Sequence, residues 1–288
     1  MQDSVVTTVL LPVALGIIML GLGLSLTLAD FKRVIVYPKA VAIGLGCQML
    51  ILPAACLGIA HLFSLPPPLA VGLMLLAASP GGATANLFSH LAKGDVALNI
   101  TLTAINSVLS LATLPLIVNY SLAHFMNDGT TIPLQFSKVI SVVAVVLVPV
   151  AIGMVIRSKK PGVADRMDKP VRIMSAAFLV LIILASIIRE RALLGEYFQQ
   201  VGITALAFNL TSMAVGYFVP RLFRVEPRQA VAIGMEIGIH NGTLAIAIAV
   251  SPSLLNNGTM AIPAAIYSLI MFFTAGAFGY FAARRAPI

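Results

Sequence analysis

The stretch EIGIHNGTLA, residues 236–245, places a carboxylate, an imidazole and a carboxamide inside an otherwise apolar run. Of all the acidic residues in the chain, Glu236 is the one that lies well inside such a run. A charged side chain at the centre of a bilayer is costly, so it is rare and usually functional. Gly238 and Gly242 flank His240 and weaken the helix around it. The stretch therefore predicts a broken helix that carries a functional carboxylate.

The composition of the chain indicates a polytopic α-helical membrane protein. Hydrophobic residues make up 59% of its 288 residues and charged residues only 10%, and the mean hydropathy is +1.02. A soluble domain could not bury that much apolar surface. The net charge of +8 comes from basic residues in the short connections between apolar runs. We therefore expect a lipid bilayer around the chain and no nucleic-acid partner.

Nine apolar segments are long enough to cross a bilayer core, which takes about 20 residues. They run approximately over 5–28, 38–62, 68–92, 96–118, 136–157, 170–188, 198–219, 228–250 and 260–283. When connections are assigned to alternate sides, Lys138, Arg189 and Arg191 fall on one side and the other Lys and Arg residues on the opposite side. This asymmetry predicts an N-terminus outside and a C-terminus in the cytoplasm.

A second broken segment is predicted at SPGGATAN, residues 79–86, because Pro80 removes a backbone donor and two glycines follow it. Non-helical backbone at membrane depth persists only where protein or a water-filled cavity satisfies it. Two broken spans in corresponding places of two halves are typical of secondary transporters built from inverted repeats. We expect the unwound backbone to lie at 83–86 and 237–240.

A bound cation is the simplest compensating charge for Glu236, because no Lys or Arg lies at comparable depth. Hard cations prefer oxygen ligands. Asn99 and Thr103 are four residues apart and so share one helix face. The oxygen-bearing side chains near the two breaks are Gln48, Thr84, Asn86, Asn99, Thr103 and Asn241.

His240 allows several roles. The imidazole could be a packing residue, could pair with Glu236 one turn earlier, could relay a proton or could touch a substrate. The residues alone leave these roles open.

Several motifs together resemble the bile acid:sodium symporter family. EIGIHNGTLA is similar to the crossover motif of that family, and SPGGATAN followed by LAKGDVALN, residues 91–99, is similar to a second pattern. LADFKRV, residues 28–34, also fits, and the resemblance covers essentially the whole chain. The resemblance implies two inverted repeats, with two crossing broken helices in a core domain beside a panel domain.

The family pattern has ten spans, and this chain matches it without the first. A single membrane unit of nine transmembrane helices over residues 1–288 is therefore expected. The panel would comprise approximately residues 5–28 and 136–188, and the core approximately residues 38–118 and 198–283.

The resemblance also implies two Na⁺ sites and a substrate site. The first sodium site would use Glu236, Asn86, Asn99, Thr103 and the backbone of Ala85. The second would use Gln48, Glu236, the carbonyls of Ile237 and Ile239, and His240. The family typically has Gln at position 240, and an imidazole nitrogen is a poor sodium ligand, so the second site could be weaker or replaced by proton coupling. The substrate would contact Thr84, Asn241, Gly82 and His240.

The expected function is therefore sodium-coupled symport of an organic anion, a small carboxylate or a bile-acid-like molecule, by alternating access, without enzyme activity. We expect a monomer in the inner membrane of a bacterium. The first alternative is proton coupling through Glu236 and His240. A passive channel is a further alternative. An intramembrane enzyme would need a nucleophile–base pair at depth, and His240 has no such partner beyond Glu236.

Overall fold

The computed structural model describes residues 11–126, 136–251 and 254–285, apart from 168, 172, 175–176 and 178–193. These residues form helices, and within them the β-type contact is an isolated bridge between Gly81 and His240. The elements in chain order are α1 (Leu11–Ser25), α2 (Leu28–Lys32), the 3₁₀ turn η2 (Arg33–Ile35), α3 (Pro38–Gly46), the π turn η3 (Cys47–Ile51), α4 (Leu52–Leu62), α5 (Pro67–Ala78), α6 (Ala83–Leu91), α7 (Val96–Phe125), α8 (Phe136–Lys159), α10 (Leu194–Leu222), α11 (Pro227–Gly238), α12 (Gly242–Val250), the 3₁₀ turn η4 (Thr259–Ala261) and α13 (Ile262–Arg285). The all-helical prediction is confirmed for this part of the chain.

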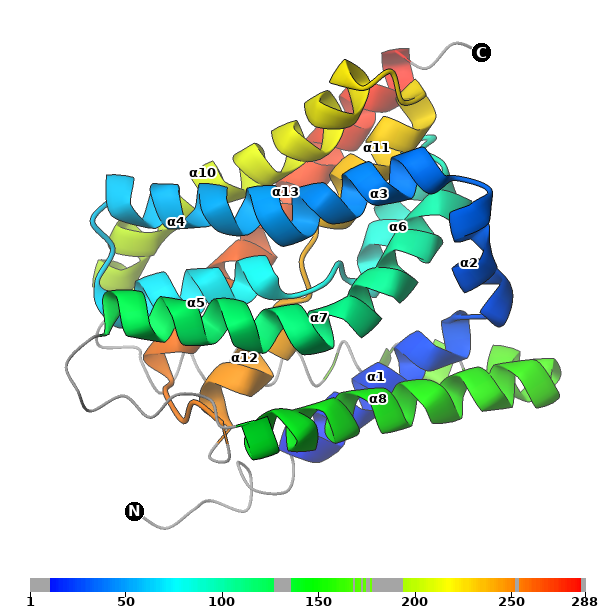
Figure 1. Ribbon diagram of the computed structural model, residues 1–288, viewed down its shortest axis with the longest axis horizontal. Helices are drawn as coiled ribbons and strands as arrows, with labels where there is room; N and C mark the ends of the chain where they lie inside the picture. Colours follow the sequence, from blue (N-terminus) through cyan, green and yellow to red (C-terminus); the bar gives the residue numbers. More distant parts are fainter. Residues whose placement is uncertain are drawn as a thin grey trace.

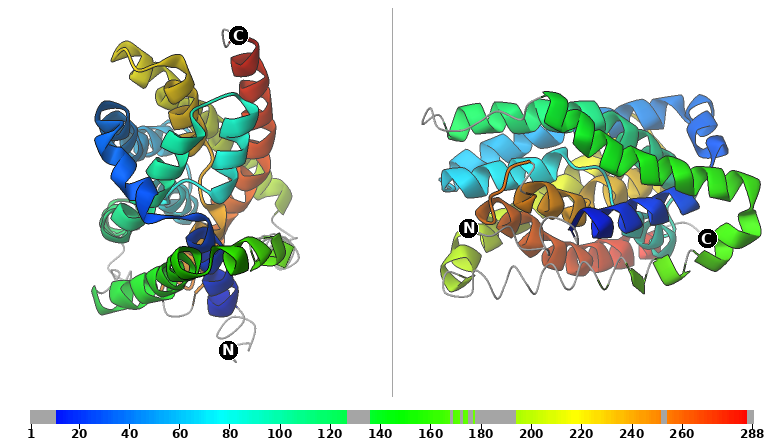
Figure 2. Two further views of the ribbon diagram at one scale, coloured as in Figure 1. Left: turned by 90° about the vertical axis from the view of Figure 1, so that its right-hand side faces the viewer. Right: turned by 90° about the horizontal axis from the view of Figure 1, so that it is seen from below.

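Helices α1 and α8 pack against each other along one edge of the molecule (Figures 1 and 2). Their contact is close because glycines face backbone: a Cβ on Gly23 would overlap the carbonyl of Val150, and one on Gly153 would lie 2.6 Å from the carbonyl oxygen of Leu20. Small residues allow this approach between helices in membranes. Helix α2 then leads from this pair to α3 (Figure 1).

Helices α3 and α4 form one long rod that is widened by the π turn η3 (Figure 1). Pro53, in the first turn of α4, has no N–H to donate to the carbonyl of Met49. The backbone instead makes a wider bond from Leu52 N–H to the Cys47 carbonyl. Such π turns frequently occur at functional positions, and this one contains the buried Gln48.

The two predicted broken segments are each a pair of short helices, α5 with α6 and α11 with α12. All residues of α5 from Leu69 to Ala78 are buried, and so are residues 242–249 of α12. A helix that is apolar and buried on all sides belongs to the interior of a bundle. The neighbours that surround these pairs include α4, α7, α10 and α13.

Three helices of the described residues are long and apolar enough to cross a membrane, namely Pro38–Leu62, Val201–Leu222 and Thr259–Arg284. A bent pair within α7, Val96–Ser110 and Ala112–Phe125, adds a fourth if it is counted as one span. The bend of 57° has a local cause, because Pro115 cannot bond the carbonyl four residues earlier, at Leu111. Nine spans therefore remain a prediction, and the segment predicted over 170–188 lies largely outside the described residues.

The helix that contains the predicted span 96–118 is longer than that span. The predicted span 96–118 continues as helix to Phe125. The helix contains polar residues beyond position 118, and the hydroxyl of Ser121 donates to the carbonyl of Ile117 within it.

The α1–α8 contact yields a prediction about stability. Gly153→Ala would force α1 and α8 apart, and overpacking of this kind costs about 1–3 kcal/mol. Gly276→Ala, on α13, is the matched control, because a Cβ there meets nothing within 4 Å. We expect thermal unfolding in detergent to shift downward for Gly153→Ala and to stay unchanged or rise slightly for Gly276→Ala. Equal midpoints for the two variants would contradict close α1–α8 packing.

Candidate functional site

The two breaks cross and pair through their backbones. Gly82 N–H donates to the Ile239 carbonyl and Asn241 N–H donates to the Pro80 carbonyl, each at 2.8 Å. These two bonds make the antiparallel bridge between Gly81 and His240, where the thin connections α5–α6 and α11–α12 pass each other (Figure 1). Each break therefore supplies the donors and acceptors that the other lost by leaving the helix.

The unwound residues differ from the expected ones. The non-helical backbone runs over 79–82 and 239–241, whereas residues 83–86 already form the first turn of α6 and Ile237 lies in the last turn of α11. The shift has a physical reason in the first break: α5 ends at Ala78, just before Pro80, and Gly82 is the N-cap from which α6 begins.

Side chains from neighbouring helices hold the carbonyls at the open ends of α5 and α11. The Gln48 amide donates to the carbonyls of Ala77, at 3.2 Å, and Ser79, at 3.0 Å. The Asn209 amide and the Tyr267 hydroxyl both donate to the Gly238 carbonyl, at 3.0 and 2.9 Å. The breaks are thus fixed by η3 on one side and by α10 and α13 on the other.

Glu236 lies in the last turn of α11 and is 1% exposed. Thr103 Oγ1 donates to its Oε2 at 2.6 Å. The carboxylate also lies against Gly81, where any Cβ would overlap it. The two ion pairs of the described residues, Asp30–Arg33 and Arg157–Asp165, do not involve Glu236.

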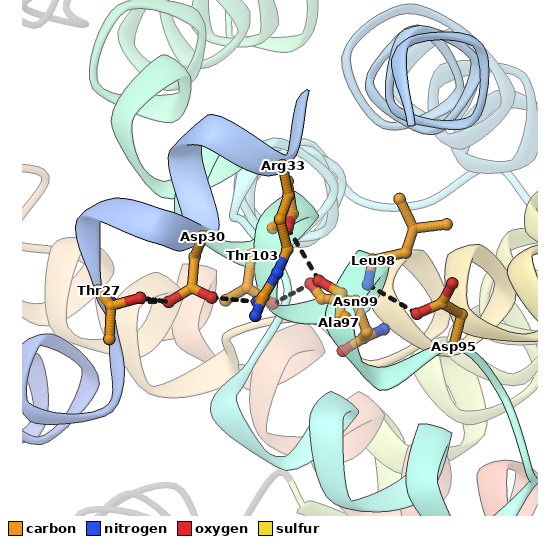
Figure 3. A network of polar contacts seen from close by, with 9 residues as sticks. Thr27, Asp30, Arg33, Asp95, Ala97, Leu98, Asn99 and Thr103 are labelled. Carbon is orange, nitrogen blue, oxygen red and sulfur yellow. Dashed lines mark hydrogen bonds and ion pairs between the residues drawn. The ribbon is translucent and has the colours of Figure 1, made fainter. Parts of the chain in front are cut away.

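Helices α7 and α11 are joined by two matched contacts one turn apart. Asn99 Nδ2 donates to the Ala232 carbonyl at 2.7 Å, and Thr103 then meets Glu236 four residues further along both helices. Figure 3 shows Asn99 and Thr103 on α7. Thr103 Oγ1 also lies 3.0 Å from the Asn99 carbonyl. If the hydroxyl proton turns to that carbonyl, the lone pairs of Oγ1 become available to a cation.

Three buried side-chain oxygens of the predicted first site have no hydrogen-bond partner: Glu236 Oε1, Asn86 Oδ1 and Asn99 Oδ1. They come from α11, α6 and α7, which pack against one another. Buried polar atoms nearly always have partners. These three atoms are acceptors, which a cation can bind, whereas Asn106 Nδ2, near Glu236, is a buried donor without a partner. Ala85, whose backbone the first site would also use, is fully buried.

The predicted second site has a similar feature around the Ser79 carbonyl. Gln48 Nε2 donates to this oxygen, and His240 Nδ1 lies 3.3 Å from it. A carbonyl only accepts, so this contact requires the proton on Nδ1 and leaves a lone pair on Nε2. Gln48 Oε1 and His240 Nε2 are both buried without partners. The Ile239 carbonyl already accepts from Gly82.

Aromatic rings enclose the His240 imidazole. Phe208 stacks on it with 5.6 Å between ring centroids, and Tyr267 meets it edge-on at 5.4 Å. The imidazole is 1% exposed. Pairing with Glu236 does not occur in this structure, because the nitrogen with a partner contacts Ser79.

The predicted substrate residues lie at the helix starts that follow the breaks. Gly82 is the N-cap of α6, and Asn241 is the N-cap of α12, where its Oδ1 accepts from Leu244 N–H at 3.0 Å. Thr84 is exposed, Asn241 is half-buried and Gly82 is buried. Helix N-termini attract negative charge.

Three residues of the site escaped the sequence analysis. Asn106, three residues after Thr103, is buried and close enough to Glu236 to interact with it, although its amide nitrogen lies outside hydrogen-bond geometry. Asn209 and Tyr267 hold the Gly238 carbonyl. The helical spacing from Thr103 could have identified Asn106, but nothing local in the sequence points to the other two.

The side chains that surround Glu236 are uncharged. The described residues hold no group of three His, Cys, Asp or Glu side chains that could bind a metal ion. The oxygens around the carboxylate belong to amides and a hydroxyl, so this site suits a cation of low charge rather than a transition metal.

A helical membrane protein in which two broken helices cross beside a buried carboxylate has the architecture of a secondary transporter. Comparison with known proteins agrees: residues 12–197 match the Sodium Bile acid symporter family. The match covers more than half of the chain, and the chain belongs to this family. It is therefore a membrane transport protein and not an enzyme.

Relatives with assigned names extend the similarity beyond the matched region. The chain is 28% identical over 255 residues to the uncharacterized sodium-dependent transporter YocS of Bacillus subtilis, covering 88% of this chain and 77% of that protein. It is 27% identical over 288 residues to the probable sodium/metabolite cotransporter BASS2 of Oryza sativa, covering 99% and 67%. The ileal sodium/bile acid cotransporter of Oryctolagus cuniculus is 26% identical over 242 residues, covering 84% and 69%.

Substitution of Gly81 and of Gly82 should affect stability differently. A methyl group on Gly81 would collide with the Glu236 carboxylate, whereas one on Gly82 would meet its nearest atoms at 3.5 Å. We expect Gly81→Ala to lower the unfolding midpoint in detergent by several degrees, as overpacking of about 1–3 kcal/mol would. Gly82→Ala should unfold close to the wild type. If both variants unfold like the wild type, the carboxylate does not lie against Gly81.

Proposed function

We propose that this protein is a secondary active transporter that couples inward sodium movement to the uptake of an organic anion. The observation that carries the proposal is the buried Glu236 carboxylate, which has an unpartnered oxygen beside the crossing of two broken helices. The names of the relatives YocS and BASS2 support sodium coupling. An ionised carboxylate buried without an ion-pair partner is stabilised by a positive charge, and a sodium ion would supply it.

In the proposed first site, sodium binds Glu236 Oε1 and the amide oxygens of Asn86 and Asn99. The Thr103 hydroxyl and the Ala85 carbonyl complete an all-oxygen ligand set. The support is that the three side-chain oxygens are buried acceptors without partners. Since Asn99 Nδ2 is held by Ala232, its oxygen end is free to face the ion.

In the proposed second site, sodium would use Gln48 Oε1, Glu236 and the carbonyls of Ile237 and Ile239. His240 occupies the remaining position with an imidazole, which is a poor ligand for a hard cation. The unpartnered lone pair on His240 Nε2 favours a second candidate, in which a proton on this nitrogen replaces the second sodium ion.

The proposed substrate is an organic anion, and we favour a small carboxylate. Its negative end would lie near the N-termini of α6 and α12, with Thr84, Asn241, His240 and the backbone of Gly82 as contacts. The positive ends of helix dipoles favour an anion there. Sodium in the neighbouring sites would add to that attraction and would make anion binding depend on the ion.

Sodium binding would order the crossing, because its ligands come from both sides of the two breaks. We propose that the core domain then moves against the panel, which includes α1 and α8, to give alternating access. The protein would act as a monomer in a bacterial inner membrane, with its N-terminus outside.

Substitution of Glu236 tests the first site. We expect Glu236→Gln to abolish the rise in unfolding temperature that sodium produces over potassium at equal ionic strength, because the amide removes the charge that pairs with the ion. A ligand present at 100 times its dissociation constant adds about 2.7 kcal/mol of stability, so the effect is measurable. Glu226→Gln, at the exposed start of α11, is the matched control. A sodium response that survives in Glu236→Gln would remove Glu236 as a ligand.

Substitution of His240 tests the second site. A glutamine in place of His240 offers a carbonyl oxygen, so His240→Gln should raise the Hill coefficient for sodium in binding or uptake assays. His90→Gln, at an exposed position on α6, should leave it unchanged. An unaltered sodium dependence in His240→Gln would place His240 outside the cation site.

A further inference from the structure

Two exposed histidines meet at the ends of helices that are distant in sequence. His61 lies at the end of α4 and His124 at the end of α7, and their Nε2 atoms are 2.7 Å apart. The rings are edge-on, with 5.0 Å between centroids. Helices α4 and α7 both pack against α5, and the two imidazoles join them directly.

Aromatic side chains position both imidazoles. Phe125 contacts the His61 ring at 5.1 Å and the His124 ring at 4.9 Å, measured between centroids. Tyr120, one turn before His124 on α7, stacks on the His124 ring at 5.6 Å with 12° between the planes. The pair is therefore held from two sides while both histidines remain exposed.

The convergence of two imidazole nitrogens has a specific chemical meaning. Between neutral rings, one nitrogen donates the single shared proton and the other accepts it. The same two nitrogens suit Zn²⁺, Cu²⁺ or Ni²⁺, for which imidazole is a common ligand. Two nitrogens on a tetrahedral Zn²⁺ at 2.0–2.1 Å lie roughly 3.3 Å apart. The pair needs to open by roughly 0.6 Å for this geometry, which exposed side chains can do, and water can complete the coordination.

We infer that His61 and His124 form a two-histidine binding site for a transition-metal dication such as Zn²⁺, which bridges α4 and α7. This site is separate from the crossing of the breaks and does not depend on the proposed sodium coupling. On the orientation predicted from the basic residues, it faces the non-cytoplasmic side, where a metal ion can reach it without crossing the membrane.

The remaining histidines and cysteines of the chain do not offer an equivalent site. The chain has four histidines and two cysteines. Cys47 and Cys56 are buried free thiols, and His240 is buried in its aromatic surroundings. His90 is exposed on α6 and takes no part in the contact between His61 and His124. His90 is therefore the matched control.

The test is titration of the untagged, detergent-solubilised full chain with ZnCl₂ by isothermal calorimetry, with MgCl₂ as the hard-cation control. We expect one Zn²⁺ per chain, with an apparent affinity that falls at least about tenfold in His61→Gln and in His124→Gln, because each removes one of two chelating nitrogens. His90→Gln should bind as the wild type does. Size-exclusion profiles and unfolding midpoints without zinc establish that each variant is folded.

A second measurement, the zinc-dependent shift of the unfolding midpoint, uses a different substitution at His61 in case the glutamine variant does not fold. Zinc should raise the unfolding midpoint of the wild type and of His90→Gln by bridging two helices, and His61→Ala should lose this rise. The inference is overturned if either single variant at His61 or His124 keeps wild-type zinc affinity. It is equally overturned if His90→Gln loses as much affinity as those variants, or if Mg²⁺ binds as zinc does.

Discussion

The antiparallel backbone pairing between residues 80–82 and 239–241 is the constraint on which the rest of the molecule depends. Unpaired peptide groups cost several kcal/mol each in hydrocarbon, so two isolated breaks would not persist there. The bonds from Gly82 to Ile239 and from Asn241 to Pro80 remove part of that cost. Gln48, Asn209 and Tyr267 remove more of it by donating to the open carbonyls. Those donations connect η3, α10 and α13 to the crossing.

The same crossing explains the position and the hydrogen bonding of the Glu236 carboxylate. Its carboxylate occupies the space left by the missing side chain of Gly81. The position of the carboxylate therefore depends on the glycine that forms the bridge. Thr103 satisfies one carboxylate oxygen and leaves the other without a partner. Oxygens of Asn86 and Asn99 are unpartnered in the same part of the bundle. A cation in this place would link α6, α7 and α11, and would thereby connect ion binding to the geometry of the breaks.

Much of this arrangement could be predicted from the sequence because it depends on local chemistry. Glu236 stood out by its depth, the two breaks by Pro80 and the glycines, and Asn99 with Thr103 by helical spacing. The register of the crossing could not be predicted, because it depends on which backbone groups of two distant segments face each other. The donors Asn209 and Tyr267, and the contact between His61 and His124, are likewise tertiary pairings. The unwound residues were misplaced by a few positions, since helix restart after a break depends on the final packing of α6.

Equilibrium binding of radioactive sodium to the purified wild-type protein, with potassium as competitor, tests the central claim most directly. If the unpartnered oxygens beside the crossing form a cation site, binding is saturable, stoichiometric with the chain and resistant to a large excess of potassium. Binding that does not saturate, or that potassium displaces as readily as sodium does, would contradict the account.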